Sequence, residues 1–133
     1  MNDLSAKISK IIEKQPHVVF AFLFGSQASG KATGESDIDL AIYFEDGHVP
    51  DPLKIIDLQA DIAAQMSKDI DLVVLNRANP IVRMQVLKNG QLIFANDSKA
   101  LSRFFVNAVM AYADLKRMRA GIEASLLNRR IHG

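Results

Sequence analysis

The sequence predicts an α/β fold, of the α+β type, in which a small mixed sheet is flanked by helices and followed by a long C-terminal helix. Short apolar runs at 18–24 and 40–44 are of strand length. Segments with apolar residues at helical spacing lie between and after such runs. The chain has 133 residues, of which 49% are hydrophobic and 23% charged, which is typical of one globular domain.

The first half of the chain predicts one helix and two strands. Apolar residues at helical spacing precede Pro16, which ends the helix: Leu4, Ile8, Ile11 and Ile12. Residues 18–24 show no alternation and are rich in Val and Phe, as expected for a strand buried on both faces. Small and polar residues fill 26–36, and 37–44 is the second strand, with Asp37 and Asp39 on the same face.

The second half predicts two helices, two strands and a long final helix. Pro52 begins a helix whose inward stripe is predicted to be Leu53, Ile56, Ala60, Ala63 and Met66. Strands are expected at 69–75 and 91–95, separated by a helix with Asn79 as N-cap. From Ser98 the pattern predicts one helix, or two that meet near Gly121. We expect a single domain over 1–133, with a catalytic core at about 18–97 and a helical segment at about 98–130.

Composition narrows the setting in which the protein works. The chain has no cysteine, no apolar stretch long enough to span a membrane and no signal-peptide pattern at Met1, which together favour the cytoplasm. The net charge is only +1, but the segment from Lys99 onward contains seven Lys and Arg residues and only two acidic residues. Such a basic segment can contact RNA, an acidic partner or only solvent, so direct nucleic-acid binding stays open.

The most informative motif is Gly25-Ser26, ten further residues, and then Asp37-Ile38-Asp39. An apolar strand leads into the Gly-Ser turn, and another follows the two aspartates. Side chains two apart on a strand share a face, roughly 6.5 Å apart, and acids placed in this way can share two divalent cations. Asp71 on a later strand is the predicted third acid, with Asp69 as its rival. The pattern therefore predicts a magnesium site beside a nucleotide triphosphate.

Other interpretations of the same residues fit less well. Gly25 to Lys31 matches the spacing of a P-loop, but Ala32 stands where a Ser or Thr must bind Mg²⁺. An EF-hand loop that started at Asp37 would place Ala41 and Ile42 at positions that need a polar ligand and a glycine. The three histidines, His17, His48 and His132, are scattered without metal-ligand spacing and are predicted to be surface or packing residues.

The motif, embedded in LFGSQASGKATGESDIDLAIYF, resembles the signature of nucleotidyltransferases of the DNA polymerase β type. Over roughly Val18 to Asp97 the chain is similar to their minimal members, the MNT proteins, and in particular to the MntA-like antitoxins of HEPN–MNT toxin–antitoxin pairs. The resemblance implies a polymerase β-like fold and adenylyl transfer from ATP to a tyrosine hydroxyl of a HEPN ribonuclease. The resemblance also implies that the protein uses two Mg²⁺ ions as its cofactor.

Within that resemblance each motif residue has an expected role. Asp37, Asp39 and Asp71 are the expected catalytic acids and metal ligands. Gly25 and Ser26 are expected to bind the nucleotide phosphates. Many relatives carry arginines directly after Gly-Ser, where this chain has Gln27 and Ser29, so a different cation is needed: Lys31, Arg77 or Arg83.

Two other functions remain open from the sequence. One is nucleotidyl transfer to a small molecule or to an RNA end. The other is a non-catalytic antitoxin that blocks its partner by binding alone.

Overall fold

The computed structural model describes residues 3–25 and 37–132. Its elements, in chain order, are α1 (Asp3–Glu13), β1 (Val18–Phe24), β2 (Ile38–Phe44), α3 (Pro52–Met66), β3 (Ile70–Val74), η1 (Leu75–Arg77), α4 (Pro80–Asn89), β4 (Gln91–Ala95) and α5 (Ser98–His132). The predicted N-cap is confirmed, because the Asn79 side chain accepts a hydrogen bond from the Val82 N–H at 2.9 Å.

The sheet is mixed, as predicted, with the strand order β3-β2-β1-β4. β1 pairs antiparallel with both β2 and β4, whereas β2 and β3 run parallel. β1 is therefore a central strand, and every one of its residues except Phe24 is buried. Burial on both faces explains why the sequence of this strand shows no alternation of polar and apolar residues.

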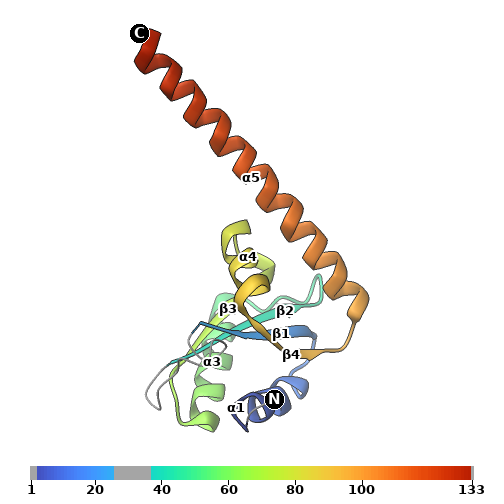
Figure 1. The fold of residues 1–133 in the computed structure, drawn as a ribbon. Helices are drawn as coiled ribbons and strands as arrows, with labels where there is room; N and C mark the ends of the chain where they lie inside the picture. Colours follow the sequence, from blue (N-terminus) through green and yellow to red (C-terminus); the bar gives the residue numbers. More distant parts are fainter. Residues whose placement is uncertain (1–2, 26–36, 133) are drawn as a thin grey trace.

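Helices cover both faces of the sheet (Figure 1). α1 and α3 lie on one face, over a core that includes Ile8, Leu40 and Ile62, all fully buried. α4 and the first part of α5 lie on the other, over a second core that includes Phe20, Val86, Phe104 and Ala108. The predicted arrangement of a small sheet between helices is confirmed.

The predicted inward stripe of α3 is wrong at its first positions. Leu53 is 75% and Ile56 is 60% exposed, whereas Ile62 and Met66 are buried. α3 carries apolar residues on most of its circumference, so spacing alone permits more than one orientation. The Gln59 side chain accepts a hydrogen bond from the Leu72 N–H at 3.1 Å, which turns that side of α3 toward β3.

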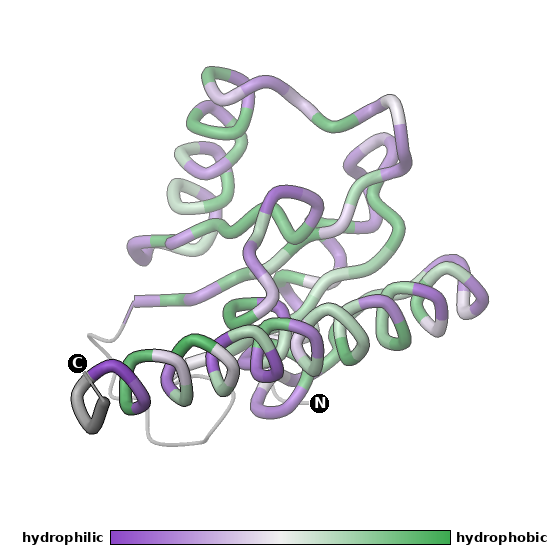
Figure 2. The backbone as a smooth tube through the Cα atoms, turned by 90° about the horizontal axis from the view of Figure 1, so that it is seen from above, coloured by the Kyte–Doolittle hydropathy of each residue, from purple (hydrophilic) through white to green (hydrophobic). Residues whose placement is uncertain are grey.

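α5 is one continuous helix of 35 residues that passes through Gly121 without a break. At 1.5 Å per residue it is about 50 Å long, and its second half extends beyond the sheet and the other helices (Figure 1). Hydrophobic and hydrophilic residues are interspersed along the coloured part of this helix (Figure 2). Among the described residues, no helix combines the length and the apolar character that crossing a membrane requires.

Candidate active site

Parallel pairing of β2 and β3 brings the predicted acids together. Asp39 and Asp71 are register partners on these strands, and Asp37 lies just before β2 begins. The Ile38 N–H donates a hydrogen bond to the Asp69 carbonyl oxygen at 2.9 Å, which aligns the start of the two strands. Asp39 is partly buried, while Asp37 and Asp71 are exposed. The three carboxylates therefore gather at one end of the sheet, where solvent can reach them.

Gly25 lies against this acid cluster at the end of β1. Its neighbour Phe24 is the register partner of Asp39, and Gly25 itself has φ +72°. A Cβ atom at Gly25 would collide with the Asp39 Oδ2 atom. Both the backbone conformation and this close approach require glycine. The absence of a side chain thus leaves room for the Asp39 carboxylate beside the Gly25 backbone.

The three acids influence one another electrostatically. Burial raises the pKa of Asp39 above its ordinary value, and the charges of Asp71 and Asp37 raise it further. Among the described residues, the ion pairs involve other groups: Glu45 with His17 and His48, and Asp114 with Arg117. The cluster therefore combines one partly buried carboxylate with two exposed ones, and the repulsion among their charges favours a cation.

The donor atoms of the cluster fit magnesium. Carboxylate oxygens are hard ligands, which Mg²⁺ prefers, and Mg²⁺ usually takes only one or two carboxylates and keeps waters and phosphate oxygens. The oxygen atoms of the three carboxylates do not all lie within 4.8 Å of one another. Among the described residues, the group of three potential ligands that meets this distance is His17, Glu45 and His48. Asp37, Asp39 and Asp71 are thus suited to hold divalent cations together with a nucleotide.

The two arginines predicted as alternative cations for the nucleotide do not lie at this end of the sheet. Ser26 and Lys31 lie outside the described residues. The Arg77 guanidinium donates to the Pro50 carbonyl oxygen at 2.7 Å, and Arg83 donates to the carbonyl oxygens of Leu75 and Asn76, each at 3.0 Å. The carbonyl groups that Arg83 contacts lie directly after the C-terminal end of β3, whereas Asp71 lies near the start of that strand. The structure therefore leaves neither arginine beside the acids.

Packing and strand pairing determine where Tyr43 and two of the histidines lie. The Tyr43 ring stacks on Phe20, with centroids 4.9 Å apart, and its hydroxyl contacts Asp46 at 3.4 Å, so it is a packing residue of the second core. His17 and His48 are exposed, as expected, but they converge on Glu45. Sequence spacing could not reveal this group, because it depends on the pairing of β1 with β2.

Comparison with known proteins identifies a matching family model and similar proteins. The family model for "Polymerase beta, Nucleotidyltransferase" matches residues 6–99. The protein adenylyltransferase MntA of Shewanella oneidensis is 28% identical over 117 residues, which cover 87% of this chain and 82% of that protein.

Solved structures show the same architecture. A chain in the crystal structure of a toxin–antitoxin with AMP-PNP superposes with a TM-score of 0.78 at 25% identity, covering 95% of this chain and 99% of that one. A chain in the structure of the tri-AMPylated Shewanella oneidensis HEPN toxin in complex with MNT antitoxin has a TM-score of 0.74 at 25% identity, covering 93% and 96%. With its mixed sheet, its acid cluster and a family model that matches well over half its length, the chain belongs to the polymerase β nucleotidyltransferase family.

Proposed function

We propose that this protein is a Mg²⁺-dependent protein adenylyltransferase that moves AMP from ATP to a tyrosine hydroxyl of a HEPN toxin and thereby acts as its antitoxin. The observation that carries the proposal is the gathering of Asp37, Asp39 and Asp71 beside Gly25 in a chain of this family. A relative of 28% identity bears the name protein adenylyltransferase, and a neighbouring structure contains an AMPylated HEPN toxin. ATP is present in the cytoplasm, where we place the reaction.

In this proposal the nucleotide lies across the end of β1 and β2. Gly25 lets the backbone approach the phosphates, and Ser26 and Lys31 supply donors to the β- and γ-phosphates. Asp37, Asp39 and Asp71 would hold two Mg²⁺ ions, whose chemistry is to neutralise the triphosphate and acidify the incoming hydroxyl. The three acids lie on one end of the sheet, which would present the α-phosphate to an acceptor in solvent.

The chemical step that we propose is a single displacement at phosphorus. A bond forms between the tyrosine oxygen and the α-phosphorus of ATP, and the bond from that phosphorus to the α,β-bridging oxygen breaks. Pyrophosphate leaves with the electron pair of the broken bond. Asp71, which is exposed, is the proposed acceptor of the tyrosine proton, since free tyrosine ionises only near pH 10.

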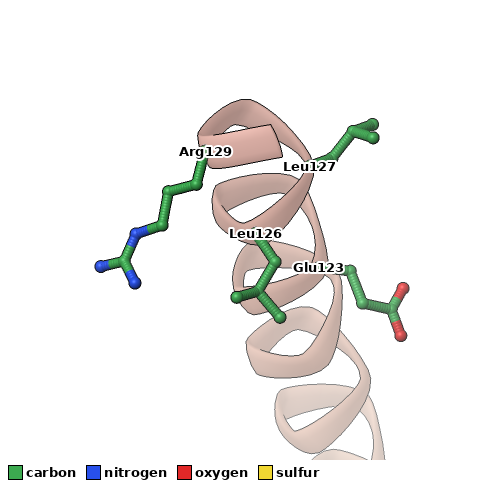
Figure 3. Close-up of a pocket in the computed structure, with 4 residues that line it drawn as sticks. All are labelled: Glu123, Leu126, Leu127 and Arg129. Carbon is green, nitrogen blue, oxygen red and sulfur yellow. The ribbon is translucent and has the colours of Figure 1, made fainter. Parts of the chain in front are cut away.

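We further propose that the second half of α5 docks the toxin. Ile122, Leu126 and Leu127 are 58%, 53% and 58% exposed on a helix that extends beyond the sheet and the other helices. Figure 3 shows Leu126 between the charged Glu123 and Arg129, and Leu127 projecting outward on the side of Glu123, away from Arg129. An exposed apolar strip with a charged margin is typical of a protein interface. On this view 1–133 is one domain, in which the core at about 18–97 catalyses and the helical segment at about 98–130 binds.

The test is transfer of label from ATP labelled at the α-phosphate, with Mg²⁺, to the product of the neighbouring gene, which the proposal identifies as a HEPN protein. Wild type should label that protein, and a chelator should prevent it. The Asp37→Asn/Asp39→Asn variant should not label it, whereas Asp57→Asn/Asp61→Asn, which removes two exposed carboxylates from α3, should label it normally. Equal labelling by both double variants would contradict the proposal.

A non-catalytic antitoxin is the second candidate, and one observation favours it. Arg77 and Arg83 are engaged with backbone carbonyls away from the acids, so neither replaces the arginines that many relatives have after Gly-Ser. If contact alone neutralises the toxin, the Asp37→Asn/Asp39→Asn variant should protect cells as well as wild type does.

A further inference from the structure

A second group of potential metal ligands lies at the opposite end of β1 and β2 from the acid cluster. His17 precedes β1, and Glu45 and His48 follow β2. One ligating atom from each lies within 4.8 Å of the other two. The Glu45 Oε2 atom is 3.2 Å from His17 Nδ1 and 3.8 Å from His48 Nδ1, and the two imidazole rings stack with centroids 4.0 Å apart.

The backbone holds these three residues together. β1 and β2 pair antiparallel with Val18 opposite Phe44, so the residues just outside that pair meet. The Glu45 N–H donates to the His17 carbonyl oxygen at 2.8 Å, and the His48 N–H donates to the Glu45 carbonyl oxygen at 3.0 Å. The group is therefore built on the ends of two central strands and does not depend on a free loop.

His17 also adopts an unusual backbone conformation, with φ +66°. A residue with a side chain seldom adopts this left-handed region, although histidine does so more often than most. Here the conformation places the His17 ring against the ring of His48 and its Nδ1 atom toward Glu45. All three side chains remain about half exposed, so an ion from solvent can reach them.

We propose that His17, Glu45 and His48 form a binding site for a transition-metal dication, for which Zn²⁺ is the reference ion. Zinc binds imidazole nitrogen and carboxylate oxygen at about 2.0–2.2 Å, so tetrahedral ligands lie about 3.3–3.5 Å apart. The spacings of 3.2 and 3.8 Å from Glu45 bracket this value. Because the lone pair of an imidazole lies in the ring plane, the stacked His17 and His48 rings must turn about their side-chain torsions for both to bind the ion. Three protein ligands leave one position for water or for a ligand from another molecule.

The chemistry of the site separates it from the acid cluster. Imidazole nitrogens select ions such as Zn²⁺, Ni²⁺ and Co²⁺, whereas Mg²⁺ prefers all-oxygen ligands. Asp39 and Glu45 are six residues apart along β2, which corresponds to about 20 Å of strand. An ion at the histidine site would tie the start of β1 to the segment after β2 without touching the acids. We therefore expect ion binding at this site to increase the stability of the fold.

The test uses the full-length chain without a histidine tag. Zn²⁺ binding is measured by titration calorimetry and by the rise in melting temperature, and Co²⁺ binding by its visible absorption. Wild type should bind one ion at this site, and His48→Ala and Glu45→Gln should each weaken binding at least about tenfold. His17→Asn serves in the same way, because asparagine tolerates a positive φ and preserves the turn.

Two control variants show whether the site is the one proposed. His132→Ala removes the remaining histidine, in α5, and should leave binding unchanged. Asp37→Asn/Asp39→Asn should also bind Zn²⁺ normally, and excess Mg²⁺ should not displace the ion. The proposal is overturned if wild type binds no Zn²⁺, if the His17, Glu45 and His48 variants bind it as tightly as wild type, or if binding is lost only in the aspartate variant.

Discussion

Asp39 and Asp71 occupy matching positions on the neighbouring parallel strands β2 and β3. Their carboxylates therefore leave the sheet on the same face and at the same level. Asp69 lies two residues earlier, and its carbonyl oxygen is bonded to the Ile38 N–H. This register distinguishes the two candidates for the third acid, because it places Asp71 beside the partly buried Asp39.

The register leads to a direct comparison of two variants. Asp71→Asn should lower adenylyl transfer by at least about 100-fold, because metal-ion stabilisation of transition-state charge is worth several kcal/mol and each 1.4 kcal/mol is tenfold in rate. Asp69→Asn should retain most of the activity. Initial rates of label transfer to the HEPN partner measure both, and the reverse order of the two variants would exclude Asp71 as the third acid.

A comparison of Gly25→Ala with Gly47→Ala should separate the effect of backbone strain on stability from the effect of a displaced Asp39 on activity. Gly25 and Gly47 both have positive φ, but a Cβ at Gly47 would have no atom within 4 Å, whereas at Gly25 it would collide with Asp39. Both Gly25→Ala and Gly47→Ala should therefore destabilise the fold by about 1–2 kcal/mol. Only Gly25→Ala should also lose activity, by roughly 100-fold, since displacing a catalytic group by about 1 Å can cost that much.

Urea unfolding and the transfer assay, run on both glycine variants, check this prediction. If Gly25→Ala loses stability but keeps its activity, the contact between Gly25 and Asp39 has no functional role.

The pKa of Asp39 predicts how stability depends on pH. Because burial and the charges of Asp71 and Asp37 raise this pKa, the folded state binds the proton more tightly than the unfolded state does. That stabilising contribution is fully present below the unfolded pKa of about 3.9 and is lost as the pH rises through the folded pKa. Asparagine cannot ionise, so Asp39→Asn should gain stability relative to wild type as the pH increases.

This prediction is checked by unfolding both proteins in urea without divalent cations at several pH values from about 4 to 8. Asp57→Asn, at an exposed position of α3, serves as the control for loss of a surface charge. A variant at Asp39 that becomes progressively less stable than wild type toward neutral pH would show that the carboxylate is held by favourable contacts instead.

The proposed docking strip on α5 predicts an effect on partner binding without an effect on the fold. Leu126→Asp and Leu127→Asp should weaken binding of the HEPN partner at least about tenfold, because charges then replace the apolar centre of the interface. Melting temperature should not change, since both residues are exposed. Leu53→Asp, at a residue that is 75% exposed on α3, is the matched control and should bind normally. If all three variants bound the HEPN partner as tightly as wild type does, the interface would lie elsewhere on the protein.

Local sequence patterns were sufficient to predict the strands, the helices and the pair of acids Asp37 and Asp39, whereas the choice of Asp71 over Asp69 depends on the pairing of β2 with β3. Val18–Phe24 is apolar throughout because it is central and buried on both faces, and Asn79 before Pro80 is a helix start that needs no tertiary contact. Asp37 and Asp39 fall on one face for the same local reason, the two-residue period of a strand.

Features that depend on contacts between distant residues were less predictable. α3 packs against the core through Ile55, Leu58, Ile62 and Met66, so the spacing of Leu53 and Ile56 was misleading. The convergence of His17 and His48 on Glu45 requires the pairing of β1 with β2. Strand register supplies that information, and no local motif in the chain encodes it.

Nucleotide binding gives the sharpest test of whether Asp37, Asp39 and Asp71 hold magnesium beside the phosphates of ATP. Calorimetric titration with a non-hydrolysable ATP analogue should show binding to wild type that requires Mg²⁺ and that the Asp37→Asn/Asp39→Asn variant lacks. The variant should remain folded, because it removes repulsion among the acids. Equal affinity of the two proteins for the analogue, with or without Mg²⁺, would contradict the claim.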